Sequence, residues 1–310
     1  MILHRGRASG RGAACYDPPT RSLQSIWHTV ATSVQRLSTA RPGYAAAALA
    51  LYIASLFIVG ARWRGFLRAF GGDVSVFRAT LATLGGIAAG NLTPAPGGET
   101  IRITLLRLDG RVTWQQATIA AIWDRLSELP PILVLGAMAL VAARQLASQS
   151  RTLWIVVAAG AAAVVAAFAI ARLRRAGVSL AGWRERLALD RISGRVFAAG
   201  VGYSALVWIQ DVLRLTCATL AFGVALSPTQ IATLSMLAML GGIVPAVAGL
   251  GPVEGGLVAG LMAFGVDLPT AAAVTALERA ISYGFSTATG AVVIALAGGR
   301  SAWSAVRGRS

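Results

Sequence analysis

Six charged side chains recur in one order in two distant stretches of the chain: Glu99, Asp124 and Arg125 in the first, and Glu254, Glu278 and Arg279 in the second. The glutamate precedes the acid–arginine pair by 25 residues in the first stretch and by 24 in the second. A glycine follows each glutamate after eleven positions. Arginine binds phosphate and carboxylate groups bidentately, and a carboxylate balances arginine or binds a cation. The pattern predicts an internal repeat that brings groups suited to an ionic ligand into matching places.

Residues that break helices precede both glutamates: Pro94, Pro96, Gly97 and Gly98 in the first stretch, and Gly249, Gly251 and Pro252 in the second. Proline lacks a backbone N–H and glycine adopts turn conformations freely, so each group predicts the tip of a helical hairpin. The helix that starts after the tip directs its unpaired N–H groups and the positive end of its dipole toward the tip. Such a helix start suits an anion such as phosphate.

Arg102 lies three positions after Glu99, on the same face of the helix and within reach of an ion pair. Of the two, Arg102 is the stronger candidate for a phosphate ligand, because guanidinium is permanently charged and forms paired hydrogen bonds. A purely structural role is equally open, in which Glu99 caps the helix and Arg102 neutralises it. Glu254 has no basic residue within four positions, so it is predicted to lack a local partner.

Further charged residues lie inside apolar runs. Asp124, Arg125 and Glu128 fall within one helical turn of each other, just before two prolines, and Asp211 and Arg214 occur in a later run. Ionisable groups at membrane depth are costly and usually face a partner, the bundle interior or a water path. Besides spans whose bounds leave some of these charges in water, two interpretations stay open. The residues form ion pairs that fix the register of the repeats, or they line a polar cavity for a charged headgroup, in which a carboxylate takes up a proton during transport.

The composition places these residues in a membrane protein. Of 310 residues, 56% are hydrophobic and 13% are charged, and the mean hydropathy is +0.67, which leaves too few polar side chains to cover a soluble globule. All 28 basic residues are arginine, and the net charge is +16. The arginines lie mainly in short gaps between apolar runs, as topogenic charges do, so a nucleic-acid partner is not expected. Two isolated cysteines and two isolated histidines offer no metal-binding spacing and no nucleophile–base pair, so neither a metal, a cofactor nor enzymatic activity is predicted.

Apolar runs close to the roughly 20 residues that cross a hydrocarbon core of about 30 Å occur along most of the chain. They are residues 44–61, 76–91, 114–143, 152–171, 196–223, 229–247 and 269–297. Two shorter runs, 99–108 and 253–264, would reach only about half of the core as helices. The predicted fold is therefore an all-α, polytopic membrane protein.

The arginine distribution orients these runs. Residues 172–195 carry seven arginines and are predicted to form a cytoplasmic basic loop. The arginines of neighbouring connections then fall on the cytoplasmic side only if 76–108 and 229–264 each enter and leave the membrane on one face. Each would be a re-entrant hairpin with a broken helix, one from each side. Together with the repeated spacing, this predicts two inverted-topology repeats, about 44–143 and 196–297, as in many secondary transporters.

The remaining segments complete the predicted organisation. Residues 1–43 form a basic, poorly ordered N-terminal arm, 44–298 form a single transmembrane domain, and 299–310 form a basic C-terminal tail. Within the domain, a helix at 152–171 connects the repeats and inverts the second one. Three tryptophans near the ends of apolar runs are predicted to be interfacial anchors: Trp63, Trp154 and Trp208.

Four motifs carry a family resemblance: RWRGFLRAFG from Arg62, NLTPAPGGETIR from Asn91, GLGPVEGGLVAGLMAFGV from Gly249 and ALERAISY from Ala276. In this order they resemble the transmembrane region of lysylphosphatidylglycerol synthases and related stand-alone flippase-like membrane proteins, over residues 44–297. The resemblance implies a protein of the bacterial inner or plasma membrane that moves a lipid with a charged headgroup between leaflets. Such a lipid is an aminoacylated phosphatidylglycerol or a polyprenyl-phosphate-linked lipid. Because no aminoacyltransferase domain follows the last predicted span, lipid lysylation by this chain is not expected.

In that interpretation Arg102, Arg125 and Arg279 hold phosphate, while four carboxylates balance them or bind a cationic headgroup: Glu99, Asp124, Glu254 and Glu278. The expected partners are an anionic or aminoacylated lipid and the bilayer itself. An alternative is an accessory protein without transport activity, which would position a lipid-modifying or glycosyl-transferring membrane enzyme. A third, an intramembrane enzyme acting on lipid-linked phosphates, would need a metal or base cluster that the sequence does not offer.

Overall fold

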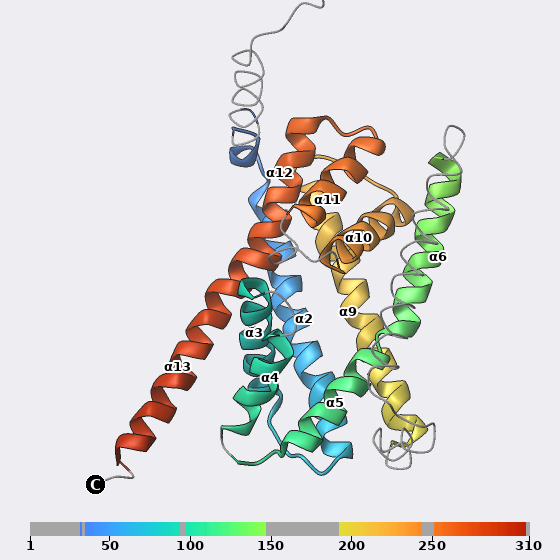
Figure 1. The fold of residues 1–310 in the computed structure, drawn as a ribbon. Helices are drawn as coiled ribbons and strands as arrows, with labels where there is room; N and C mark the ends of the chain where they lie inside the picture. Colours follow the sequence, from blue (N-terminus) through green and yellow to red (C-terminus); the bar gives the residue numbers. More distant parts are fainter. Residues whose placement is uncertain are drawn as a thin grey trace, which may run out of the picture.

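The computed structural model describes residues 32, 35–93, 97–108, 110–146, 192–243 and 251–307, and its regular elements there are helical (Figure 1). Most of the expected N-terminal arm, the connecting helix 152–171 and most of the basic loop lie outside the described residues, as do Pro94, Pro96, Gly249 and Trp154. The described helices are α2 (Pro42–Ala69), α3 (Val76–Leu92), α4 (Gly97–Arg107), α5 (Trp114–Leu126), α6 (Leu129–Leu146), α9 (Gly194–Leu220), α10 (Pro228–Ile243), α11 (Pro252–Ala263), α12 (Leu268–Arg279), the π-helical η3 (Ala280–Phe285) and α13 (Ser286–Arg307).

Three helices in the described part are long and apolar enough to cross a membrane. They are α2 with 28 residues, α9 with 27, and the continuous helix Leu268–Gly298 with 31, which joins α12, η3 and most of α13. At 1.5 Å per residue each is about 40 Å or longer, against about 30 Å of hydrocarbon. Helices α2 and α9 run antiparallel and make the most extensive helix–helix contact (Figure 1). Helix α13 continues to Arg307, into the segment expected to be a tail.

Two helical hairpins flank this antiparallel pair. Helix α3 packs on α4 in the lower half of Figure 1, and α10 packs on α11 in the upper half. In both hairpins the two helices pack closely at a glycine. A Cβ at Gly98 would lie 2.7 Å from the carbonyl oxygen of Gly86, and a Cβ at Gly241 would lie 2.8 Å from the carbonyl oxygen of Pro252. Small residues let helix backbones approach closely in a membrane. Helices α4 and α11 have 11 and 12 residues, the half-length expected from the sequence.

Gly290 is where α13 touches α3, and it provides a test of this packing. A Cβ at Gly290 would lie 2.2 Å from the carbonyl oxygen of Leu84 and 2.6 Å from the Cβ of Ala88. Because the backbone must move to accept it, Gly290→Ala is expected to destabilise the protein by about 1–3 kcal/mol, measured by thermal unfolding in detergent. Gly298→Ala in the same helix is the matched control, since nothing lies within 4 Å of its Cβ. Equal unfolding temperatures for the two variants would contradict the close contact.

The apolar run 114–143, expected as one span, is divided into two helices. Helix α5 ends at Leu126, a turn follows at Ser127 and Glu128, and α6 begins at Leu129. The adjacent prolines, Pro130 and Pro131, explain the break, because proline is tolerated in the first turn of a helix but not in its interior. The C-terminal part of α5, which carries Asp124, lies against α2.

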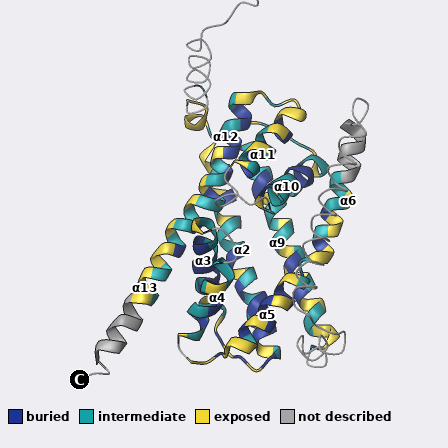
Figure 2. Ribbon diagram, viewed as in Figure 1, coloured by how far each residue is buried: buried dark blue, intermediate teal, exposed yellow. Residues whose placement is uncertain are grey.

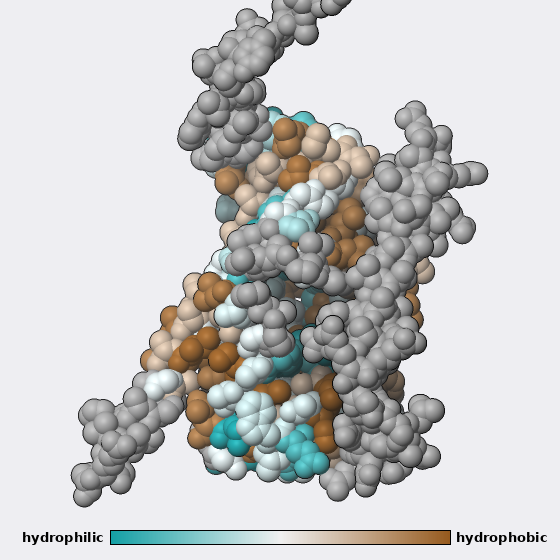
Figure 3. Space-filling model, viewed as in Figure 1, coloured by the Kyte–Doolittle hydropathy of each residue, from teal (hydrophilic) through white to brown (hydrophobic). Residues whose placement is uncertain are grey.

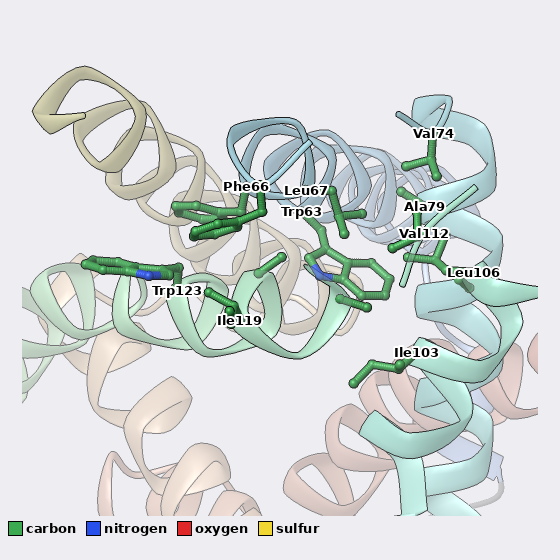
Figure 4. Packing of buried hydrophobic residues seen from close by; sticks show 14 residues of the cluster. Trp63, Phe66, Leu67, Val74, Ala79, Ile103, Leu106, Val112, Ile119 and Trp123 are labelled. Carbon is green, nitrogen blue, oxygen red and sulfur yellow. The ribbon is translucent and has the colours of Figure 1, made fainter. Parts of the chain in front are cut away.

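The first core packs α2 against α3, α4 and α5 around Trp63, which is completely buried (Figure 4). The second core packs the four helices α9, α10, α11 and α12 together, and it includes Leu234, Leu257 and Leu261. Buried residues gather where these helices meet, whereas much of α13 is exposed (Figure 2). The expectation that Trp63 is an interfacial anchor was wrong: nearness to a helix end does not show which way a side chain points.

The surface is apolar over large parts of the molecule. Helix α9 exposes Leu206, Ile209 and Leu213, spaced three and four residues apart along one face. On α13, Val292 and Leu296 are exposed in the same way. Figure 3 shows hydrophobic side chains over α13 and hydrophilic ones at the lower end and in the middle of the same face. Exposed apolar stripes of this kind are stable against lipid rather than water.

Candidate functional site

A connected network of charged side chains, here called the first cluster, lies between α2, α4 and α5. It contains three arginines and three carboxylates, so its charges balance: Arg62, Glu99, Arg102, Asp124, Arg125 and Glu128.

Asp124 is the centre of the first cluster, and its side chain is completely buried. Its Oδ1 accepts a hydrogen bond from Nε of Arg62 at 2.7 Å, and its Oδ2 accepts one from Nη1 of Arg102 at 3.0 Å. Arg62 also donates to Glu128 at 2.5 Å and to the hydroxyl of Ser204 at 2.8 Å. A buried charge is tolerated only when it is paired and hydrogen-bonded, and these contacts meet that need for Asp124 and Arg62. Asp124 thus joins α5 to α2 and α4, and Arg62 joins α2 to α9.

The outer edge of the first cluster is open. Arg125 donates from Nε to Glu99 at 3.1 Å and from Nη1 to Glu128 at 3.2 Å, and its side chain is 57% exposed. Glu99 is 38% exposed and lies 3.6 Å from Arg102, so the ion pair expected within α4 is present but long. Arg102 itself is buried, with its guanidinium 3.7 Å from the ring centre of Trp63. A ligand from outside the protein can therefore reach Arg125 and Glu99 but not Arg102.

The second cluster lies between α9, α11 and α12 and consists of Asp211, Arg214, Glu254, Glu278 and Arg279. Arg214 donates from Nη1 to Oε1 of Glu278 at 2.5 Å and also pairs with Asp211. Arg279 donates from Nε to Oε1 of Glu254 at 2.7 Å. Glu254 has no basic neighbour within four positions, but its charge is paired through Arg279, which lies 25 residues further along the chain.

Glu254 also starts α11. Its Oε2 accepts the backbone N–H of Gly251 at 2.6 Å, while Gly251 has a φ of +92°, which glycine adopts without a Cβ clash. One carboxylate thus joins the first turn of the half-length helix to Arg279 on α12.

The two clusters repeat the same connections. In each, an arginine of a long helix binds the acid of the acid–arginine pair, at separations of 62 residues for Arg62–Asp124 and 64 for Arg214–Glu278. In each, the glutamate at the start of a short helix binds the arginine of that pair, at separations of 26 and 25 residues. Neither Arg62 nor Arg214 is among the binding residues predicted from the sequence, although Arg214 is among the charged residues noted within apolar runs. Arg214 lies inside the apolar run 196–223, which was an available signal, whereas Arg62 follows directly after the run 44–61 and gave no such signal.

A cavity of about 190 Å³ borders the second cluster. Its polar lining consists of Asp211, Arg214, Ser235 and Glu278, and its other walls are apolar, including Leu257 and Trp208. Trp208, which the sequence predicts to be an interfacial anchor, also lines this wall. No residue of the first cluster lines the cavity.

The structure gathers all seven sequence-predicted binding residues into these clusters. Glu99, Arg102, Asp124 and Arg125 belong to the first cluster, and Glu254, Glu278 and Arg279 belong to the second. Of the predicted hairpin tips, Gly97 and Gly98 begin α4, and Gly251 and Pro252 begin α11. No described ion pair joins the two clusters to each other.

Long apolar helices with lipid-suited faces, enclosing ion pairs between them, define an all-helical integral membrane protein. The chain belongs to the family of lysylphosphatidylglycerol synthase transmembrane regions, whose model matches residues 26–290, so the resemblance inferred from its motifs is confirmed.

Two proteins of similar sequence are also membrane proteins. The chain is 28% identical to a UPF0104 membrane protein of Methanothermobacter thermautotrophicus, with 83% of this chain and 86% of the relative covered. It is 22% identical to a UPF0104 membrane protein of Pyrococcus horikoshii, with 86% and 91% covered. A comparison with solved structures found no significant match.

Proposed function

We propose that this chain is a flippase-like transporter, which carries a lipid with a charged headgroup between the leaflets of a bacterial inner or plasma membrane. One observation carries the proposal: the accessible ion pairs Glu99–Arg125 and Glu254–Arg279 each lie at the start of a half-length helix. A headgroup with a phosphate can replace the glutamate on the arginine, because both anions fit the same guanidinium edge. The family of the chain supports a lipid substrate.

The proposal includes an inverted arrangement of the two halves, each with a re-entrant hairpin. Three observations support it: α2 and α9 are antiparallel, α3–α4 and α10–α11 lie in opposite halves of the molecule, and α4 and α11 are too short to cross (Figure 1). Backbone that leaves the helical state at membrane depth must be covered by protein or water. Inverted repeats of broken helices meet this need in many secondary transporters, with binding sites between the repeats.

The residues have different roles in this transporter. Arg125 and Arg279 hold the phosphate, because their present partners, Glu99 and Glu254, are partly exposed and can be exchanged. Arg102 does not contact the phosphate but stabilises the first cluster, since it is buried against Asp124. The carboxylates released from arginine can then bind a cationic part of the headgroup. An aminoacylated phosphatidylglycerol or a polyprenyl-phosphate-linked lipid has the required charge.

Reconstitution into liposomes tests the proposal. Fluorescent phosphatidylglycerol, aminoacylated phosphatidylglycerol and polyprenyl phosphate are each added to one leaflet, and their arrival in the other is followed with an impermeant quencher. At least one lipid is expected to move faster than in protein-free liposomes. Glu254→Gln and Arg279→Gln should each slow it about tenfold or more, since a hydrogen bond to a charged group contributes about 1.5–3 kcal/mol. Asp73→Asn is the control, because its pair with Arg68 is highly exposed.

Two results would contradict a transporter. One is that no lipid of the panel moves faster than in protein-free liposomes. The other is that a charge-swapped variant, Glu254→Arg with Arg279→Glu, keeps the full biological activity. An accessory protein needs only the ion pair and tolerates the swap, whereas a phosphate ligand needs its arginine in place.

A further inference from the structure

The two clusters differ in charge although their connections match. In the first, the buried carboxylate of Asp124 lies between two arginines, Arg62 and Arg102. In the second, the buried guanidinium of Arg214 lies between two carboxylates, Asp211 and Glu278. Counting whole clusters, the first has three arginines and three carboxylates, and the second has two arginines and three carboxylates. Among the described residues, the second cluster therefore carries one uncompensated negative charge.

One position accounts for the difference. Arg102 lies three residues after Glu99, and the residue three after Glu254 is Leu257. Leu257 is buried and lines the cavity beside the second cluster. Where the first half of the chain supplies a guanidinium, the second half thus supplies an apolar wall and an open space.

Two polar groups at this cavity have no hydrogen-bond partner among the described residues: Oε2 of Glu278 and the hydroxyl of Ser235. Both residues are at least nine-tenths buried. A buried carboxylate oxygen without a donor is strongly unfavourable, more so than an unpaired neutral group. The carboxylate of Asp211 borders the same space and has one oxygen bound to Arg214. The cavity therefore presents acceptors and excess negative charge, and it needs donors and one positive charge.

We propose that this cavity binds a primary ammonium group. The three N–H donors of an ammonium match three oxygen-bearing groups, Glu278, Asp211 and Ser235, and its charge balances the cluster. The apolar walls, including the Trp208 ring, suit the carbon atoms attached to the nitrogen. At about 190 Å³ the space exceeds that of one water, about 30 Å³ in the liquid, and admits a short alkyl chain. The ammonium belongs either to a free amine or to a lipid headgroup, and only the second source rests on the proposed function.

Thermal unfolding of the detergent-solubilised protein tests binding directly. Ethylammonium chloride is compared at equal ionic strength with tetramethylammonium chloride, which has the charge but no N–H donor, and with sodium chloride. Ethylammonium at about five times its Kd is expected to raise the unfolding midpoint by roughly 2–4 °C, and the two control salts are expected to leave it unchanged. An equal rise with either control salt, or no rise with ethylammonium, would overturn the proposal.

Variants locate the site. Glu278→Gln removes the excess charge, and Leu257→Arg supplies the missing guanidinium, so each is expected to abolish the ethylammonium response. Leu257→Met changes the wall without adding charge and should keep it. Ser235→Ala is a mild change that should weaken binding about three- to tenfold by removing one acceptor. If Leu257→Arg does not fold, the responses of Glu278→Gln and Ser235→Ala to ethylammonium decide whether it binds in this cavity. Full responses in both would overturn the assignment to this cavity.

The source of the ammonium is decided in liposomes. If the site takes a lipid headgroup, free ethylammonium should slow the movement of aminoacylated phosphatidylglycerol and leave that of phosphatidylglycerol unchanged. A thermal response without any lipid movement would support the ammonium site for a free amine and contradict the proposed transporter. Lipid movement without a thermal response would support the proposed transporter and contradict the ammonium site.

Discussion

Asp124→Ala is expected to lower the free energy of unfolding by about 3–5 kcal/mol, as the loss of one partner from a buried ion pair does. The substitution leaves the buried guanidiniums of Arg62 and Arg102 facing an empty space, and both donate hydrogen bonds to Asp124 now. A guanidinium stays charged in proteins, so neither arginine can relieve the loss by becoming neutral. Chemical denaturation in mixed micelles measures the change.

Asp73→Ala is the control for that experiment. Asp73 forms an ion pair with Arg68 in which both side chains are more than half exposed. Exposed pairs of this kind contribute about 0–1 kcal/mol, so little change is expected. If Asp124→Ala costs no more than Asp73→Ala, water must reach Asp124, and the buried network described above would be incorrect. The double variant with Arg62→Met should recover part of the loss, because it removes one of the stranded charges.

Trp63→Ala is expected to have a comparable effect, a loss of about 3–5 kcal/mol, as for other large aromatic residues deleted from a core. The indole is completely buried among Phe66, Leu67 and residues of α4 and α5 (Figure 4). Its removal leaves a cavity and also takes away the ring face beneath the guanidinium of Arg102. The loss is measured from the thermal or chemical unfolding of the purified protein.

Trp114 provides the comparison for Trp63. Its ring faces Arg107 at 4.9 Å, but the residue is 45% exposed. Trp114→Ala should therefore cost about 1 kcal/mol or less, the contribution of an exposed cation–π contact. Trp63→Phe should lie between the alanine variant and the original protein, because it keeps an aromatic face but not the full volume. Similar losses for Trp63→Ala and Trp114→Ala would show that burial does not decide the effect.

The sequence was sufficient to predict features that depend on neighbouring residues. The helix breaks before Glu99 and Glu254 follow from local proline and glycine chemistry, and the structure starts α4 and α11 there. The repeated spacing also picked out charged residues that the structure gathers into the two clusters, and their role in binding stays a prediction. The all-helical class follows from composition and long apolar runs. Re-entry from opposite membrane faces stays a prediction.

Features that depend on distant residues were not predictable from one sequence. Arg62 binds an acid 62 residues away, and no local pattern distinguishes it from an arginine that anchors a helix end in the headgroup region. Likewise, Trp63 and Glu254 were assigned from their sequence neighbours, whereas their burial and pairing depend on helices packed beside them. The exchange of Arg102 for Leu257 can be read from the sequence, but the cavity that Leu257 lines beside Glu278 is seen only in the structure.

The long separations within the first cluster bear on how the chain is made. Synthesis finishes α2 before the partners of Arg62 exist, since Asp124 follows by 62 residues and Ser204 by 142. During that interval the unpaired guanidinium of Arg62 must stay near water or lipid headgroups, because hydrocarbon provides no hydrogen-bond or ion-pair partner. Helix α2 can therefore reach its final depth only after α5 and α9 have left the ribosome. This delay makes the burial of Arg62 a late step in the assembly of the molecule.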